Sequence, residues 1–274
     1  MALRNYAEAG SRVRELYRAG RSFHSLGTAA RLAAKHRPTD YSPVGVWDAL
    51  AVLERFEDLS DPDVDEANMQ HALQTAESMR AQGLPDWMQL TGLTHDFGKL
   101  LFLTGCDEDG TSLATQWSIV GDTYVLGVPL PPDMVYPEFN SLAPEQHTGL
   151  GVYAAGCGLD RCVVSYGHDE FLHSALVASR HQLPDAALRA IRYHSLYPWH
   201  QGGHYVELES AEDVEGKRWV QMLNEHDLYS KTARRIALEE VRPHYQALLD
   251  KYLPEGINFG GAISVAMHSI ARLI

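Results

Sequence analysis

Carboxylate and imidazole side chains lie on the apolar faces of several predicted helices, and this feature constrains the fold more than any other. A helical turn of about 100° per residue places Leu93, Asp96 and Leu100 on one stripe, so that a carboxylate points toward the core. An ionised carboxylate that is buried without a partner costs several kcal/mol. The fold must therefore supply Asp96 with a cation, a metal ion or strong hydrogen-bond donors.

Similar side chains recur elsewhere along the chain. His194 and Asp227 share the apolar stripes of the helices that end near them, while His71 lies on a helix of its own and His168 opens another. His95 can reach the same ion as the carboxylate that follows it, because both side chains leave a single helical turn. The candidate ligands are His71, His95, Asp96, His168, His194 and Asp227.

Each candidate also has a simpler interpretation when it is taken alone. A lone histidine on an apolar stripe is usually a core imidazole with both nitrogens satisfied, Asp227 could accept a hydrogen bond between helices, and His168 could simply start a helix. Together, the six residues favour metal binding. Imidazole and carboxylate without thiolate suit iron, manganese or zinc, and the set offers more donors than one tetrahedral zinc ion needs. The sequence therefore predicts a two-metal site in which Asp96 bridges the ions.

The periodicity predicts a mostly α-helical protein. A single domain over residues 1–274 is expected, because the sequence has no internal repeat, low-complexity tract or linker rich in Pro, Gly or Ser. Ser42-Pro43 is typical of a helix start, with serine as the N-cap and proline as the first helical residue. Strand character is confined to residues 117–128, so a short β or loop-rich excursion is expected near 115–145. Further helices are predicted over residues 67–81, 86–104, 167–181, 185–196, 217–230 and 235–252.

Composition narrows the function. The 274 residues include 23 basic and 36 acidic ones, and the net charge of −13 argues against nucleic acid or anionic lipid as a partner. Cys106, Cys157 and Cys162 form no C-x-x-C pair, which favours a reducing, cytoplasmic setting. No signal peptide, membrane anchor or membrane-spanning segment is expected.

The order His, His-Asp, Asp is the signature of the HD-domain superfamily, and within it the chain closely resembles the inositol oxygenases. The likeness runs from near the N-terminus to about residue 252. The segments that carry it are Arg4-Asn5-Tyr6, Ser60-Asp61-Pro62-Asp63-Val64-Asp65, His71-Ala72-Leu73-Gln74-Thr75-Ala76-Glu77, His95-Asp96-Phe97-Gly98-Lys99, Val120-Gly121-Asp122-Thr123, Cys157-Gly158-Leu159-Asp160, Gly167-His168-Asp169-Glu170, His194-Ser195-Leu196-Tyr197-Pro198-Trp199-His200 and Asp227-Leu228-Tyr229-Ser230-Lys231.

This resemblance implies a helical, monomeric enzyme with a mixed-valent Fe(II)/Fe(III) pair that uses O2 to cleave the ring of myo-inositol, giving D-glucuronate. It implies that the six candidates above are the iron ligands, that Asp96 bridges, and that Lys99 lowers the pKa of a bound hydroxyl. Residues 1–40 would contribute an arm and a helix to the substrate pocket. The implied substrate contacts are Arg4, Asp58, Leu59, Ser60, Lys99, Gly121, Asp122, His194 and Ser195.

Three alternatives share parts of this pattern. A metal-dependent HD phosphohydrolase would use the same ligands, but the ligand segments carry Lys99 without an obvious basic cluster for phosphate. A related di-iron oxygenase could act on another substrate, and a non-catalytic HD module could bind a ligand only. Without the motif, Lys99 would be read as a solvated amine. Residues 106–112 and 129–146 depart in length and composition from the animal members, which bears on the choice of inositol isomer.

Overall fold

The computed structural model describes residues 6, 9–60, 68–229 and 235–271. Helices dominate this part of the chain, so the mostly α fold is confirmed. Within it, no helix is both long and apolar enough to cross a bilayer. The elements in order are α1 (Ser11–Phe23), α2 (Leu26–Lys35), β1 (Pro43–Val44), α3 (Val46–Leu53), α4 (Asn68–Ala81), α5 (Asp86–Thr94), the 3-10 helices η1 (Phe97–Thr104), η2 (Pro137–Leu142) and η3 (Leu159–Arg161), α6 (His168–Val177), α7 (Asp185–Tyr193), α8 (Tyr197–His200), η4 (Val206–Leu208), α9 (Ala211–Tyr229), α10 (Leu238–Tyr252), β2 (Ile257–Asn258) and α11 (Gly261–Ala271).

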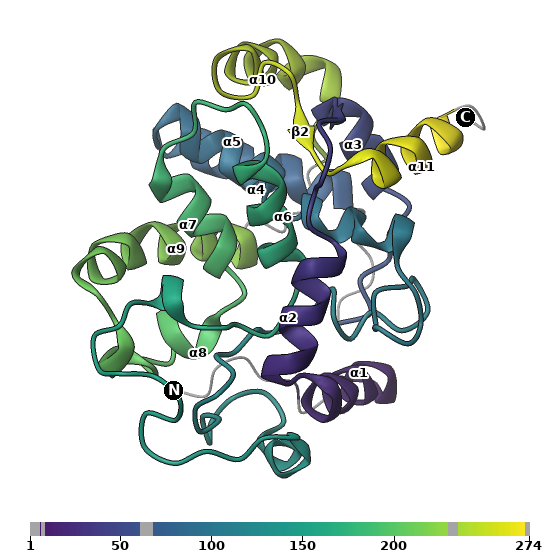
Figure 1. The fold of residues 1–274 in the computed structure, drawn as a ribbon. Coiled ribbons are helices and arrows are strands. Elements are labelled where there is room, and N and C mark those ends of the chain that lie inside the picture. Colours follow the sequence, from purple (N-terminus) through teal and green to yellow (C-terminus); the bar gives the residue numbers. More distant parts are fainter. Residues whose placement is uncertain (1–5, 7–8, 61–67, 230–234, 272–274) are drawn as a thin grey trace.

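Helix α5 packs against α4, α7, α9 and α10, and in Figure 1 it lies below α10 and above α7 and α9. The hairpin between α4 and α5 follows from local sequence. Gly83 ends α4 in the left-handed conformation at φ 71°, and Pro85 stands directly before α5. Helices α6 and α7 pack against each other, α6 also covers η1, and α7 contacts α9. We call α4, α5, η1, α6, α7 and α9 the helical cradle.

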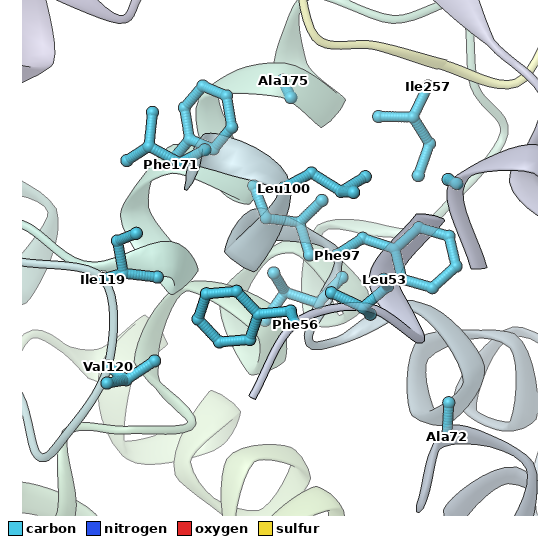
Figure 2. Close-up of a cluster of buried hydrophobic side chains, with 14 of the residues drawn as sticks. Leu53, Phe56, Ala72, Phe97, Leu100, Ile119, Val120, Phe171, Ala175 and Ile257 are labelled. Atoms are coloured by element: carbon cyan, nitrogen blue, oxygen red, sulfur yellow. The ribbon is translucent and has the colours of Figure 1, made fainter. Parts of the chain in front are cut away.

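The largest apolar core includes buried residues of this cradle and extends beyond it to α3, which packs against η1 as α6 does. Figure 2 shows Leu53, Phe56, Phe97 and Leu100 in one cluster of buried apolar side chains. The stripe that was predicted around Asp96 is therefore buried, since Leu93 and Leu100 have no exposed surface and Asp96 is only 6% exposed. Burying apolar surface at this point fixes η1, and with it the carboxylate, against the neighbouring helices.

The predicted helix over 86–104 is interrupted. Helix α5 ends at Thr94, and the chain continues after Asp96 as the 3-10 helix η1. Gly98 gives one physical reason for the close packing here, because a Cβ atom at this position would lie 1.8 Å from the carbonyl oxygen of His168. A residue with a side chain could not allow the first residue of α6 to approach η1 so closely.

Two local predictions were wrong. Pro43 does not start a helix but pairs with Asn258 in a two-stranded antiparallel sheet, so α3 begins only at Val46. Residues 117–128 form no strand among the described residues and contribute only an isolated bridge between Val125 and Val164. Positive φ angles at Gly121 (93°) and Gly127 (78°) break the extended conformation that a ladder needs.

The loop-rich excursion is present but longer than expected. It spans residues 105–166, which we call the connecting segment, and its only regular elements are η2 and η3. Its C-terminal end is joined to residues 124–126 by hydrogen bonds from Leu126 N to the Val163 carbonyl and from Ser165 N to the Tyr124 carbonyl, both 2.8 Å. This segment therefore packs as loops whose backbone groups pair with one another.

Candidate metal centre

The structure brings all six predicted ligands to one place inside the helical cradle. His71 lies on α4, His95 and Asp96 lie between α5 and η1, and His168 is the first residue of α6. His194 directly follows α7, and Asp227 lies in the last turn of α9. Elements far apart in sequence therefore converge on the single His-Asp step that follows α5.

The ligand atoms form two overlapping groups that could each hold a metal ion. One group contains His71, His95 and Asp96, the other contains Asp96, His168 and His194, and the ligand atoms within each group lie within 4.8 Å of one another. Asp96 is the member that the two groups share. Its Oδ1 lies 3.2 Å from His168 Nε2, while its Oδ2 lies 3.5 Å from His95 Nε2.

Asp227 completes the first group. Its Oδ1 lies 2.8 Å from His71 Nε2 and 3.3 Å from His95 Nε2. Burial alone would raise the pKa of Asp227, but the neighbouring His95 and His71 hold it well below its ordinary value. Asp96 behaves in the same way, because Lys99, His95 and His168 outweigh the effect of its burial. Both carboxylates therefore stay ionised and available as ligands.

Three imidazoles are held by hydrogen bonds from Nδ1 to backbone carbonyls. His95 donates to Gly92 at 2.8 Å and His194 donates to Ile191 at 2.6 Å, in both cases three residues back in the chain. His168 begins its helix and has no preceding turn, so it donates instead to Ile119 of the connecting segment at 2.6 Å. Because a carbonyl oxygen only accepts, each Nδ1 carries the proton and each neutral ring turns an Nε2 lone pair into the cluster.

The inward-facing nitrogens fit a metal ion. His168 Nε2 and His194 Nε2 lie 2.9 Å apart, a spacing at which the two nitrogens can share a proton or bind one metal ion. Two nitrogens bound at right angles to one ion, each about 2.1 Å from it, are about 3 Å apart. His95 Nε2 is buried and makes no hydrogen bond of good geometry within the described residues. The donor set of imidazoles and carboxylates suits iron, manganese or zinc.

The charges of the imidazoles differ within the cluster. Burial lowers the pKa of His95, but Asp96 and Asp227 more than offset this and raise it to about 9. Burial, together with His168 and His95, lowers the pKa of His194 to about 3. Burial also lowers the pKa of His168, but Asp96 outweighs it and raises the pKa above its ordinary value, so in a metal-free cluster His194 stays neutral between protonated neighbours.

Lys99 is not a solvated amine. It is 7% exposed, and its Nζ lies 2.9 Å from Asp96 Oδ2 and 2.8 Å from Asp58 Oδ2. Burial lowers the pKa of Lys99, but these two carboxylates outweigh it and raise the pKa above its ordinary value. Asp58 also accepts hydrogen bonds from the backbone N and the Oγ of Ser60, at 2.8 and 2.7 Å. The loop at residues 57–60 is therefore joined to the cluster through Lys99.

Backbone hydrogen bonds join the segments that carry Ser195, Gly121 and Asp122 to residues of the cluster. Ser195 follows His194, and its carbonyl accepts a hydrogen bond from Thr123 N at 2.8 Å. Gly121 and Asp122 thus lie between Thr123 and Ile119, which both bond to residues at the cluster. Arg4 lies outside the described residues, as do residues 61–65 and 230–231 of the matching segments.

Gln116 is a site-supporting residue that the sequence gave no reason to single out. Its side chain accepts a hydrogen bond from Leu59 N at 3.0 Å and donates to the carbonyls of Glu57 and Leu113. It is 1% exposed and adopts a φ of 49°, which is uncommon for a residue other than glycine. No periodicity marks it, because its role depends on contacts across some sixty positions of sequence. Gly98 lies in a matching segment and could have been recognised as a close-approach glycine.

The chain was compared with known proteins. A family model described as myo-inositol oxygenase matches residues 10–259. A probable inositol oxygenase of Oryza sativa subsp. japonica is 38% identical over 263 residues, covering 92% of this chain and 83% of the rice protein. The inositol oxygenases of Mus musculus and Sus scrofa are 36% and 37% identical, each over 92% of this chain and over 89% and 90% of their own lengths. The chain belongs to the myo-inositol oxygenase family.

Proposed function

We propose that this chain is an inositol oxygenase that uses O2 to convert myo-inositol to D-glucuronate. The four-electron reaction balances as C6H12O6 + O2 → C6H10O7 + H2O. The observation that carries the proposal is Asp96, which is shared by two groups of potential ligands in a chain whose relatives are named inositol oxygenases. It favours two ions over the single ion of a simpler site.

The proposed cofactor is a pair of iron ions in the mixed-valent Fe(II)/Fe(III) state. His71, His95, His168, His194 and Asp227 would hold the ions, with Asp96 bridging them. When bound, the ions would supply electrons to O2 and acidify substrate hydroxyls. The hydrogen bonds to Gly92, Ile119 and Ile191 support this assignment, because they leave each Nε2 free to bind metal.

Lys99 is proposed to hold one substrate hydroxyl. An ammonium group has three donors, and Asp96 and Asp58 take two of them, so one donor is left for a ligand. Its positive charge would lower the pKa of the hydroxyl that it contacts. Since its own pKa is raised, Lys99 keeps its proton and acts by donating a hydrogen bond and not as a base.

The remaining contacts suit a neutral polyol. Asp58 and Asp122 would accept hydrogen bonds from hydroxyls, while Ser60, Ser195 and the backbone at Leu59 and Gly121 would complete the pocket. Arg4 would act from the N-terminal segment. A charged substrate such as a phosphate ester would need several cations, and Lys99 is already paired with two carboxylates. This balance of charge favours inositol over a phosphate ester.

Other parts of the proposal concern the protein as a whole. We propose a single domain and a monomer, since ligands from position 71 to position 227 meet at one cluster within one chain. A cytoplasmic location agrees with the three free cysteines, because a reducing compartment keeps such thiols unpaired.

The deciding experiment measures oxygen uptake by anaerobically purified, iron-loaded protein after addition of myo-inositol. Glucuronate is assayed in the same vessel, and iron is counted per chain. The proposal expects one O2 consumed per glucuronate formed, with two irons. Absence of uptake, together with phosphate release from esters under Mn2+ or Mg2+, would overturn it in favour of a phosphohydrolase.

A further inference from the structure

The two helices that present His168 and His194 are joined by an ion pair directly beside these histidines. Glu170 follows His168 by two positions on α6, and Arg192 precedes His194 by two positions on α7. Arg192 Nε lies 2.7 Å from Glu170 Oε2, and Arg192 Nη2 lies 3.3 Å from Glu170 Oε1. A pairing of two nitrogens with two oxygens restricts both the distance and the relative rotation of the groups that it joins.

A third residue fixes the other side of the guanidinium. Arg192 Nη1 lies 3.0 Å from Asp160 Oδ1 on η3, and the same oxygen accepts a hydrogen bond from the Tyr193 hydroxyl at 2.8 Å. Arg189, one turn earlier on α7, also pairs with Asp160 at 2.9 Å. The guanidinium of Arg192 is thus held at both ends, and the side chain is only 15% exposed. Solvent therefore screens the pair of Arg192 with Glu170, which is 24% exposed, less than a surface pair, whereas Asp160 is 59% exposed and its pair is screened more.

The cluster itself holds the two pairs of imidazoles together to different degrees, so an ion pair between the helices matters more for one pair than for the other. Asp227 itself lies within 3.3 Å of both His71 and His95, so a carboxylate draws these two imidazoles together. His168 Nε2 and His194 Nε2 instead approach each other directly at 2.9 Å, and within the described residues no carboxylate forms an ion pair with His194. The distance between His168 and His194 therefore also depends on how α6 and α7 are held against each other.

We propose that Glu170 and Arg192 are positioning residues that set the spacing of His168 and His194 and thereby the affinity of the metal ion bound on that side of Asp96. The proposal rests on the two-metal site of the proposed function. It distinguishes the ions, because the pair acts on His168 and His194 and leaves His71, His95 and Asp227, on the other side of Asp96, unchanged.

The test is an anaerobic titration of the full metal-free chain with Fe(II) against a competing chelator, which gives one dissociation constant for each ion. Glu170→Gln and Arg192→Met should each raise the dissociation constant of one ion by about 10- to 100-fold and leave that of the other ion unchanged. Arg192→Lys, which keeps the charge but loses the two-pronged geometry, should recover part of the loss. The matched control is Arg180→Met, which removes an exposed ion pair with Glu255 at 3.0 Å and should change neither constant.

A second set of variants assigns the weakened ion. In a His194→Ala background, Arg192→Met should have no further effect on the ion that remains, whereas in a His71→Ala background it should keep its full effect. Equal weakening of both ions, no weakening, or a full effect in the His194→Ala background would overturn the proposal while leaving the proposed function intact. A wild-type chain that binds fewer than two ions would overturn both. Thermal unfolding of the metal-free variants checks that each one folds.

Discussion

The helical cradle and the connecting segment support the same cluster in different ways. On the cradle, His95 and His194 are oriented by carbonyls three residues back in their own chain, so the local helix geometry sets each ring. His168 starts its helix and depends on Ile119 of the connecting segment, 49 positions away in sequence. Helices thus supply most of the ligands, whereas the connecting segment supplies the carbonyl oxygen that orients His168, which has no preceding helical turn. Changes in the cradle should therefore affect metal binding, and changes in the connecting segment should affect the pocket and its attachment.

The largest effect is expected for Asp96→Ala, which tests the cradle at its shared residue. Bound iron should fall from two ions to none, because Asp96 belongs to both ligand groups. In the metal-free protein, Lys99 loses one of its two buried partners, and breaking a buried pair costs about 3–5 kcal/mol. Iron analysis and thermal unfolding measure both effects. A full complement of two irons in this variant would refute the bridging role, and Asp86→Ala, at an exposed pair with Lys251, serves as the control.

Gly98→Ala tests the contact between η1 and α6. The added Cβ would lie 1.8 Å from the His168 carbonyl oxygen, so the backbones must separate. We expect a loss of about 3 kcal/mol in the free energy of unfolding, at the upper end of the usual range for overpacking, and weaker metal binding. Gly27→Ala is the matched control, since its Cβ would meet only Ser25 Oγ at 3.8 Å and should stabilise α2 by up to about 1 kcal/mol. Equal stability of the two variants would contradict the prediction.

The protonation of His24 tests the contact between the N-terminal helices and the connecting segment. Its Nε2 lies 3.2 Å from the Tyr166 carbonyl, and burial lowers the pKa of His24 to about 4. The unfolded chain takes up this proton near pH 6.5 and the folded chain only near pH 4, so stability is fully present above pH 6.5 and is lost as the pH falls toward 4. The loss amounts to at most about 3 kcal/mol.

Urea unfolding of the wild type and of His24→Gln at pH 7 and pH 4.5 checks this expectation. The variant cannot take up the proton, so it should lose less free energy of unfolding between the two pH values. The same loss in both proteins would show that His24 does not contribute to the acid sensitivity.

The smallest effect is expected for Gln116→Leu in the connecting segment. The variant keeps the volume but leaves Leu59 N and the Glu57 carbonyl without their partner, at a cost of about 1–3 kcal/mol. Because the loop that carries Asp58 loses its attachment, the KM for inositol should rise while the iron content stays at that of the wild type. Gln82→Leu, at an exposed position, is the control. Loss of iron in Gln116→Leu would contradict the expectation that changes in the connecting segment affect the pocket and leave metal binding unchanged.

Helix periodicity predicted the helices correctly where the buried residues lie on a single face of the element. The predicted helices near α4, α6, α7 and α10 lie close to their observed bounds, since amphipathic periodicity is a local property. It failed at Pro43, which pairs with Asn258, because no local pattern announces a partner more than two hundred positions away. It also failed at 117–128, where apolar residues that look like a strand pack as loops.

By itself, the sequence determined that six potential metal ligands exist and that a buried carboxylate among them needs a cation, a metal ion or strong donors, because an ionised side chain on an apolar stripe needs a partner. Only the tertiary structure decided which atoms meet. It placed Lys99 between two carboxylates, turned His168 toward His194, and joined Glu170 to Arg192. The physical reason is that periodicity fixes the face on which a side chain lies, whereas distances of about 3 Å between elements depend on how whole helices and loops pack together.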